Sequence, residues 1–312
     1  MNSLPEPHPL DFDWRFTPET VEEFVALIGK ERGLLAVGTP SIARRFCQLG
    51  REVVLVDRQP FHLVCNHSQI EIDSNTPEIS GFCTAVVDPP WYQEHVMTWI
   101  AWSARCVGVG GQIYASIWPP DTRPTGESEF EEVIDWLKGW STVSLHNQHP
   151  RYDLPLFERG SIEAGLKQDL SISPRIGRLL KINVQSLPEV PPLKNKKEKW
   201  LRFVFDDYQL ALRLRQDNPT GPAIVPLPGI ENCKWPYVSR RAPGRDLIDI
   251  WSSRNEVAVV NGSAKVADIL RQVALAEDQA AFDTALSAVP LLANWKIPRP
   301  PYRRVSEWAH PQ

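Results

Sequence analysis

The sequence is poor in cysteine, and its cysteines lack the spacing of a metal site. Five cysteines occur in 312 residues, which is an odd number. A disulfide framework needs paired cysteines, whereas unpaired thiols are typical of the reduced cytosol. His62, Cys65 and His67 lie close together but lack a second pair of ligands. The sequence therefore predicts a cytoplasmic protein without structural disulfides and without a metal ion.

The sequence also lacks a basic segment followed by an apolar leader, and it lacks any apolar run long enough to cross a bilayer. It therefore predicts neither secretion nor a membrane partner. Hydrophobic residues make up 42% of the chain and charged residues 23%, which favours a packed core over disorder. The length fits one large domain or two of ordinary size.

Positive charge is scarce in the first half of the chain. Residues 1–150 contain 10 Lys and Arg against 20 Asp and Glu, whereas residues 151–312 contain 24 against 18. This asymmetry indicates an anionic partner for the second half, such as nucleic acid. Uneven solvation of two domains would produce the same pattern, and the counts alone do not separate the two explanations.

The most informative stretch is Ala-Val-Val-Asp-Pro-Pro-Trp-Tyr at residues 85–92. Its β-branched start predicts a buried strand, and two prolines then end both strand and helix. A carboxylate at Asp88 and a rigid carbonyl at Pro89 can accept hydrogen bonds from the two N–H groups of a planar amine. The indole of Trp91 can stack on the ring that carries this amine. Groups that are fixed in this way hold the reacting atoms in the orientation that the reaction needs.

Asp88, Pro89, Pro90 and Trp91 together resemble motif IV of the amino-methyltransferases that use S-adenosylmethionine. The form with Trp is similar to that of the messenger-RNA adenosine methyltransferases. The resemblance implies that these four residues are catalytic and that the acceptor is an exocyclic amine. A proline-stiffened loop with Trp91 in the core remains the structural alternative.

A second motif lies upstream, where a predicted strand leads into Gly38, Thr39, Pro40 and Ser41 and then into a helix. A glycine turn before a helix offers free N–H groups to a ligand, and Ser41 is a candidate helix cap. The turn resembles motif I of S-adenosylmethionine-dependent methyltransferases. Its Gly-Thr-Pro-Ser form is similar to that of the probable adenine methyltransferase family, some of whose members act on protein lysines. This resemblance implies that these four residues bind the cofactor.

Asp57 ends the next predicted strand, 52–57. Its spacing from Gly38 along the sequence is close to that expected of an acid that binds ribose hydroxyls. The order of these sites, with the cofactor motif before the catalytic motif, matches one arrangement of the amino-methyltransferases. Strands alternate with helices from about residue 33 to 160, which predicts a mostly parallel α/β sheet with ligands at the carboxyl ends of its strands.

The expected architecture is a Rossmann-like class I methyltransferase domain over residues 1–165 and a C-terminal α+β extension over residues 166–312. The extension is expected to recognise the substrate. Its candidate features are a basic run at 194–199, a strand at 200–205 and one long helix at 263–286. Basic and aromatic residues also interleave there, as in proteins that bind unpaired bases: Trp235, Tyr237, Arg240, Arg241 and Arg245.

The predicted function is methyl transfer from S-adenosylmethionine to an exocyclic amine, with adenine N6 in DNA or RNA as the leading acceptor. A base that is flipped out or already unpaired would stack on Trp91. Two alternatives stay open. The acceptor is a lysine or glutamine side chain of a protein, or the domain is a catalytically silent methyltransferase fold that serves as a binding module. A partner subunit that recognises the target is compatible with each.

Overall fold

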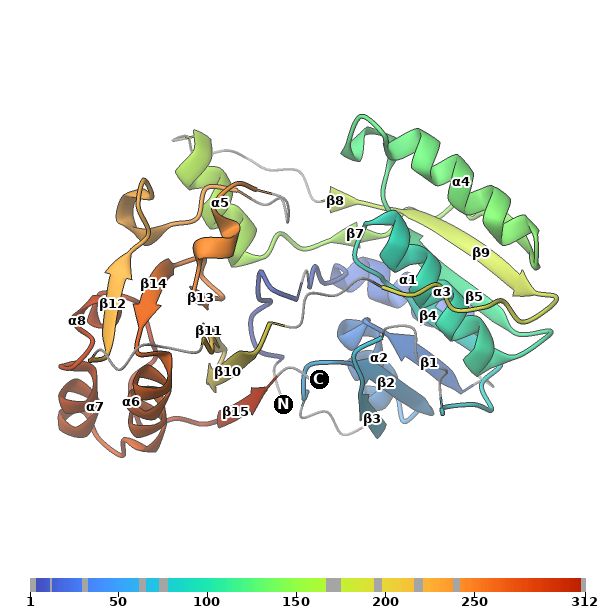
Figure 1. Cartoon of the computed structure of the whole chain (residues 1–312). Helices are drawn as coiled ribbons and strands as arrows, with labels where there is room; N and C mark the ends of the chain where they lie inside the picture. Colours follow the sequence, from blue (N-terminus) through green and yellow to red (C-terminus); the bar gives the residue numbers. More distant parts are fainter. Residues whose placement is uncertain are drawn as a thin grey trace.

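The protein is described by a computed structural model in which residues 4–11, 13–29, 33–61, 66–72, 78–166, 175–193, 198–215, 221–237 and 242–309 are placed. These residues form two lobes, each built on its own sheet, with the start of the chain running between them (Figure 1). Within these ranges, no helix combines the length and the apolar content needed to cross a bilayer.

The first lobe is built on a seven-stranded sheet. Five neighbouring strands run parallel, and the last two pair in the antiparallel sense, so the sheet is mostly parallel as predicted. In spatial order the strands are β3 (Asn66–Gln69), β2 (Val53–Asp57), β1 (Leu34–Val37), β4 (Thr84–Val87), β5 (Gln112–Ile117), β9 (Arg178–Val184) and β6 (Ser141–Leu145).

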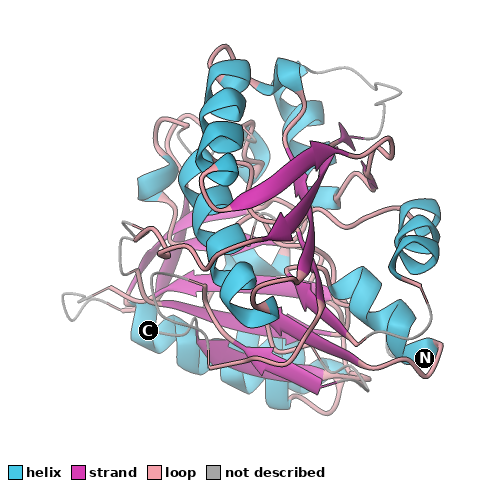
Figure 2. Cartoon of the chain, turned by 90° about the vertical axis from the view of Figure 1, so that its right-hand side faces the viewer, coloured by secondary structure: helices cyan, strands magenta, loops and turns pink. Residues whose placement is uncertain are grey.

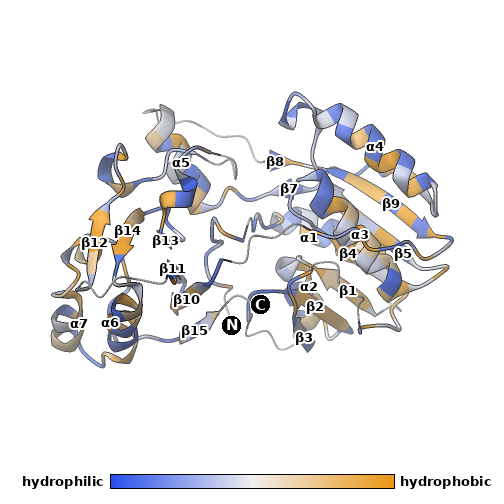
Figure 3. Ribbon diagram, viewed as in Figure 1, coloured by the Kyte–Doolittle hydropathy of each residue, from blue (hydrophilic) through white to orange (hydrophobic). Residues whose placement is uncertain are grey.

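Helices cover both faces of this sheet (Figure 2). Helices α1 (Pro18–Ile28) and α2 (Pro40–Gln48) pack on one face, and α3 (Gln93–Val107) and α4 (Gly126–Lys138) pack on the other. Successive residues of a strand point to opposite faces, so Leu34 and Ala36 join one core while Leu35 and Val37 join the other. Strands β1 and β4 are buried along their whole length as a result, whereas α4 alternates polar and apolar positions (Figure 3).

The second lobe has a six-stranded antiparallel sheet with three helices on one side. In spatial order the strands are β12 (Ala223–Pro226), β14 (Val257–Asn261), β13 (Ile250–Ser252), β11 (Tyr208–Arg213), β10 (Trp200–Phe205) and β15 (Val305–Ala309). The helices are α6 (Ser263–Leu275), α7 (Gln279–Leu286) and α8 (Pro290–Ala293). The single helix expected over 263–286 is wrong, because the chain breaks after Leu275 and Asp278 caps a new helix.

The chain passes between the lobes more than once, so the two sheets do not divide at residue 165. Helix α5 (Leu156–Leu166) precedes that boundary but contacts the second lobe, where Asn255 donates to Ser161. Strand β9 follows the boundary but lies between β5 and β6 of the first sheet. The sequence did not predict that β9 returns to the first sheet, because a single antiparallel strand without an adjacent helix does not continue the alternation of strands and helices. Short segments complete the fold: β7 (Arg151–Tyr152), β8 (Arg175–Ile176), η1 (Pro120–Thr122), η2 (Glu231–Cys233) and η3 (Arg245–Leu247).

The N-terminal arm, residues 4–16, ties the lobes together. Asp11 accepts from Arg58 of the first lobe at 2.8 Å and from Arg202 of the second at 3.0 Å. Asp11 and Arg202 are both buried, with side chains 3% and 0% exposed. His8 bonds to the carbonyl oxygen of Trp251 at 2.9 Å. The arm is therefore an integral part of the junction rather than a segment lying on the surface.

We expect Asp11→Ala to lower the free energy of unfolding by about 3 kcal/mol, because it leaves a buried guanidinium without its counter-ion. The measurement is urea unfolding followed by tryptophan fluorescence. The matched control is Asp135→Ala, which breaks an exposed ion pair with Lys138 and should cost less than about 1 kcal/mol. Equal losses in the two variants would contradict the assigned role of the arm.

Candidate active site

Three candidate residues identified from the sequence lie side by side at the carboxyl edge of the first sheet. In the register of neighbouring strands, Val37 of β1 pairs with Val56 of β2 and with Val87 of β4. The next residue along each strand is Gly38, Asp57 or Asp88. Neighbouring strands are about 4.8 Å apart, so the backbones of Asp57 and Asp88 are about 10 Å apart with Gly38 between them. This edge is where strand order reverses in the sheet, and α/β proteins bind ligands there.

The Gly38 turn touches the Asp88 loop directly. The N–H of Asp88 donates to the carbonyl oxygen of Val37 at 3.0 Å. Gly38 has a φ of +64°, and a Cβ built on it would lie 2.6 Å from the Trp99 ring and 3.0 Å from the Asp88 carbonyl oxygen. Glycine is therefore required here by conformation and by close packing. The cradle that a Cβ would fill is occupied by the protein's own indole.

Thr39 and Pro40 begin helix α2 at this turn. Thr39 occupies the N-cap position and Pro40 the first helical position. The hydroxyl of Thr39 makes no capping bond, and its oxygen is buried without a hydrogen-bond partner among the described residues, in a side chain only 1% exposed. Buried hydroxyls are normally paired, so this oxygen is suited to a bound ligand. Ser41, expected as the cap, lies inside the first turn of the helix instead.

Asp57 lies at the end of β2, where an acid can reach a ribose. Its Oδ1 accepts from the backbone N–H of Gln59 at 2.8 Å, which fixes the carboxyl group. Burial raises the pKa of Asp57 to about 8, and the nearby charges of Asp13 and Asp11 act in the same direction. This raised pKa favours the protonated form of Asp57 at neutral pH when no ligand contacts it. A ligand that brings hydroxyl donors would favour the ionised form.

Asp88 is held by Tyr152 from outside the motif. The Tyr152 hydroxyl donates to Asp88 Oδ1 at 2.7 Å and shares a second short hydrogen bond with the Ser116 hydroxyl. Burial raises the pKa of Asp88 well above its usual range, while the bond from Tyr152 acts against this shift. One oxygen of Asp88 thus accepts from Tyr152, and the other accepts from no protein donor among the described residues.

The Trp91 side chain is partly buried, and contacts on two sides hold it in place. Its ring meets that of Tyr152 edge to face, with centroids 5.4 Å apart and planes at 85°. Its carbonyl oxygen accepts from Arg123 Nη1 at 2.8 Å, and Arg123 itself lies over the Trp118 ring. The indole is therefore held in position from both its ring and its backbone, as a stacking surface needs to be.

The Asp88 loop opens into a pocket with about 280 Å³ of empty space, part of it open to solvent. One wall consists of Asp88, Pro89 and Trp91, and the remaining lining residues come from elsewhere in the chain: Trp14, Tyr152 and Arg175. Neither Gly38 nor Asp57 lines this pocket, so it belongs to the candidate acceptor residues rather than to the candidate cofactor residues. Pro90 is not among the lining residues, and its carbonyl oxygen accepts from the Tyr92 N–H.

We expect Tyr152→Phe to lower the rate of group transfer about tenfold, because Asp88 loses the bond that orients it. The affinity for the cofactor should stay within about twofold, since Tyr152 does not touch Gly38 or Asp57. Single-turnover kinetics and calorimetric titration measure the two quantities separately. Equal effects on rate and cofactor affinity would indicate general damage instead.

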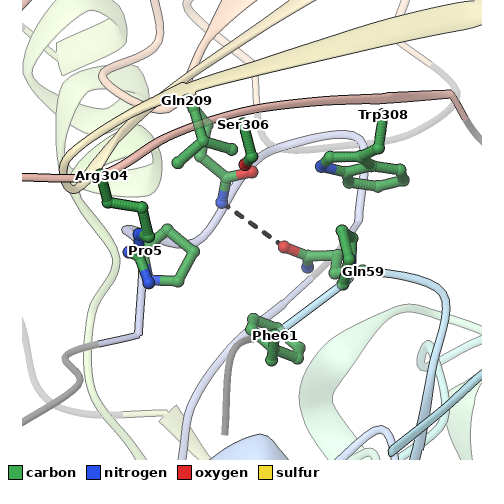
Figure 4. A pocket seen from close by; sticks show the side chains of 9 residues that line it. Pro5, Gln59, Phe61, Gln209, Arg304, Ser306 and Trp308 are labelled. Atoms are coloured by element: carbon green, nitrogen blue, oxygen red, sulfur yellow. Dashed lines mark hydrogen bonds between the residues drawn. The ribbon is translucent and has the colours of Figure 1, made fainter.

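A second hollow lies between the lobes, next to the chain that follows Asp57. Gln59 and Phe61 of the first lobe face Gln209 and Trp308 of the second across it (Figure 4). Gln209 donates to Gln59 at 3.5 Å and to a backbone carbonyl of the arm. These amides join the two lobes two residues after Asp57.

Several features expected of the second half have a different role. Trp235 is 1% exposed and belongs to a core cluster, so it cannot stack on a base, whereas Tyr237 is 49% exposed. Arg245 lies over the Trp251 ring. The remaining basic candidates lie outside the described residues, as do His62 and Cys65: residues 194–197, Arg240 and Arg241. Among the described residues, no group of three acids, histidines or cysteines is placed to hold a metal ion.

No protein-family model and no curated protein sequence matches this chain. Solved structures do match it. The branched-chain polyamine synthase of Thermus thermophilus, bound to N4-aminopropylspermidine and 5′-methylthioadenosine, superposes with a TM-score of 0.50 at 15% identity, and a mutein of it with 0.51. Each match covers 62% of this chain and 64% of the synthase. The guanosine N2-methyltransferase of T. thermophilus 16S ribosomal RNA matches 67% of this chain and 51% of its own, at 13% identity and a TM-score of 0.34.

The chain thus spans less than two thirds of the synthase, and at such identity the likeness concerns the fold. In this chain the strand order is β3-β2-β1-β4-β5, followed by the antiparallel strand β9 inserted before β6. The first lobe is therefore a Rossmann-like α/β domain with a mostly parallel sheet, as predicted, and the likeness to the synthase is one of fold.

Proposed function

We propose that the protein is an enzyme that transfers the methyl group of S-adenosylmethionine to the exocyclic amine of a nucleobase, with adenine N6 as the acceptor. The observation that carries this proposal is the register that sets Gly38, Asp57 and Asp88 side by side on three adjacent strands. A cofactor turn and an acceptor acid must be neighbours for a methyl group to pass between their ligands.

The residues on the cofactor side fit a nucleoside with a charged tail. Asp57 offers a carboxylate to the two ribose hydroxyls, and the unpartnered Thr39 oxygen can accept a hydrogen bond from the amino acid portion. The N–H groups at the start of α2 are available to a carboxylate, which the helix dipole favours. When bound, S-adenosylmethionine supplies an electrophilic methyl group on a sulfonium and is left as a neutral thioether.

The residues on the acceptor side perform the orienting work. Trp91 presents its ring to a planar base, and the free oxygen of Asp88 accepts one N–H of the amine. The Pro89 carbonyl is the candidate acceptor for the other N–H. With both N–H bonds engaged, the nitrogen lone pair turns out of the ring plane towards the methyl donor. A nitrogen–carbon bond forms, the carbon–sulfur bond breaks, and the nitrogen loses its extra proton to solvent.

The direct test incubates the protein with S-adenosylmethionine labelled in the methyl group and, separately, with single-stranded DNA, duplex DNA, RNA and cell protein. We expect label in a nucleic acid, and N6-methyladenine by mass after digestion to nucleosides. Asp88→Asn serves as the blank. Label in protein alone would replace the nucleobase with a protein side chain.

Two further arms address the remaining classes of function. Decarboxylated S-adenosylmethionine with spermidine tests aminopropyl transfer, the class to which the polyamine synthase belongs. Calorimetric titration with S-adenosylmethionine tests the silent module, because absence of binding at millimolar ligand would leave no cofactor role for Asp57. Product in the first arm, or no heat in the second, would each overturn the proposal.

A further inference from the structure

Part of the lining of the candidate acceptor pocket comes from residues outside the two methyltransferase-like motifs. Trp14 comes from the N-terminal arm and Arg175 from strand β8, and both line the pocket together with Asp88 and Trp91. The arm reaches this place because Phe16 bridges to Tyr152, with ring centroids 4.8 Å apart. The composition of this part of the lining determines what kind of acceptor the pocket admits.

A buried carboxylate fixes the two side chains of this part of the lining. Glu158 is 4% exposed. One of its oxygens accepts from the indole N–H of Trp14, and the other accepts from Arg175 Nε at 2.8 Å and from Arg175 Nη2. The guanidinium lies over the Trp14 ring, 4.8 Å from its centroid. Arg175 is thus a preorganised group rather than a freely moving surface cation.

This arrangement leaves one end of the guanidinium available. Nε and Nη2 of Arg175 are turned to Glu158, while Nη1 has no hydrogen-bond partner among the described residues. The side chain is 32% exposed and lines the pocket. A fixed N–H donor beside a stacking surface is suited to an acceptor oxygen with negative charge, and phosphate is one of the groups that arginine binds through charge-assisted hydrogen bonds.

The charges of the pocket point in the same direction. Glu158 and Arg175 neutralise each other, and Asp88 is the single acid among the residues that line the pocket. A lysine ammonium or a polyamine would meet the Arg175 guanidinium beside it. A neutral base with a negatively charged phosphate on its sugar has the complementary charge.

We propose that Arg175 binds a phosphate of the acceptor, so that the substrate of this site is a nucleotide within an unpaired or flipped-out stretch of polynucleotide. This inference rests on the proposed function and names its substrate class. Trp14 and Trp91 then form the two aromatic walls between which the base is held, and Glu158 is a positioning residue that acts through them.

The test measures binding rather than turnover, using fluorescence anisotropy of a labelled single-stranded oligoadenylate at several salt concentrations. Each phosphate contact on a single strand contributes about 0.7 to the slope of log affinity against log salt. We expect Arg175→Gln to reduce the steepness of this slope by about 0.7. The matched control is Arg45→Gln, because Arg45 is 34% exposed, pairs with Glu22 and lies away from the pocket; its slope should be that of the unaltered protein.

Arg175→Gln leaves Glu158 buried without its cation, so a second variant guards against loss of folding. The double change Glu158→Gln with Arg175→Gln removes both charges and should show the same reduced slope at an unaltered melting temperature. An unchanged slope in both variants would overturn the phosphate contact. A peptide lysine methylated faster by Arg175→Gln than by the unaltered protein would overturn it as well.

Calorimetric titration with S-adenosylmethionine separates this inference from the function on which it rests. We expect Arg175→Gln to bind the cofactor as the unaltered protein does, because Arg175 does not touch Gly38 or Asp57. Cofactor binding with an unchanged salt slope would remove only the phosphate contact. An unaltered protein that binds oligoadenylate but no cofactor would keep the phosphate contact and remove the methyl transfer.

Discussion

Replacing Asp88 with alanine should lower the turnover of methyl transfer about 10²- to 10³-fold, the usual effect of removing one preorganised polar group from a reacting centre. The amine would lose the acceptor that orients it, and the Tyr152 hydroxyl would lose the partner to which it donates. The backbone of Asp88, which touches the Gly38 turn, is unchanged. We therefore expect the affinity for S-adenosylmethionine to stay within about twofold.

Asp88→Asn refines this experiment because it keeps the shape of the side chain and an oxygen that accepts from Tyr152. Its amide cannot replace an ionised carboxylate, so a loss nearly as large as that of the alanine variant is expected. Asp135→Ala, on the exposed face of α4, is the control for unspecific effects of removing an acid. Turnover within threefold of the unaltered protein in both Asp88 variants would exclude this residue from the reaction.

Replacing Asp57 with asparagine should weaken binding of 5′-methylthioadenosine by about 2 kcal/mol, or roughly 30-fold, because bonds to an ionised acceptor become bonds to a neutral one. This nucleoside carries the ribose and the adenine but no amino or carboxyl group. Its own ionisation therefore does not change over the pH range of the experiment. Calorimetric titration provides the affinity directly.

The pH dependence of that affinity is the sharper measurement. The pKa of Asp57 is raised to about 8 when no ligand contacts it, so below this pH a proton must leave before the carboxylate can accept two hydroxyls. Affinity should therefore rise by up to about tenfold per pH unit from pH 6 to about 8 and then level off. Asp57→Asn should show no such rise. A flat profile in the unaltered protein would mean that ribose binding does not depend on this carboxylate.

The same shift has a defined effect on stability. The folded pKa of about 8 lies above the ordinary value of 3.8, so between these values the folded protein holds a proton that the unfolded chain has released. The contribution of Asp57 to the free energy of unfolding is therefore lost as pH rises through that window. Asp57→Asn should remove this part of the pH dependence, which chemical denaturation at pH 5 and pH 8 would detect.

Most of the parallel part of the first sheet was predictable because local patterns report it. Strands β1, β2, β4 and β5 are short, mainly apolar runs next to amphipathic helices, whereas β3 is polar and has no such pattern. Gly38, Asp57 and Asp88 were placed at strand ends by this reasoning, and parallel strands share their carboxyl edge. Only the structure shows the register that brings the three residues side by side, because the sequence of a single strand does not specify how it pairs with its neighbours.

The rest of the site depends on contacts over long separations. Tyr152 lies 64 residues from Asp88, and Trp14 lies 144 residues from the Glu158 that orients it. No local period links such pairs, so no pattern in the sequence marks the arm, although Phe16 is buried in a hydrophobic core. A tyrosine two residues after a proline and a tryptophan among charged residues are weak signals, and both look like ordinary loop residues in sequence.

The order of synthesis matters for the N-terminal arm, because the arm is made before the residues to which it bonds. His8 and Trp251 are bonded across 243 residues, and Asp11 and Arg202 across 191, so the arm leaves the ribosome long before its partners exist. The first sheet can pair beforehand, since its last strand ends at Val184. Trp14 has its partners at Glu158 and Arg175, earlier in the chain than these residues of the second lobe. A nascent chain could therefore assemble the edge that carries Gly38, Asp57 and Asp88 before the beginning of the arm is fixed by contacts with the second lobe.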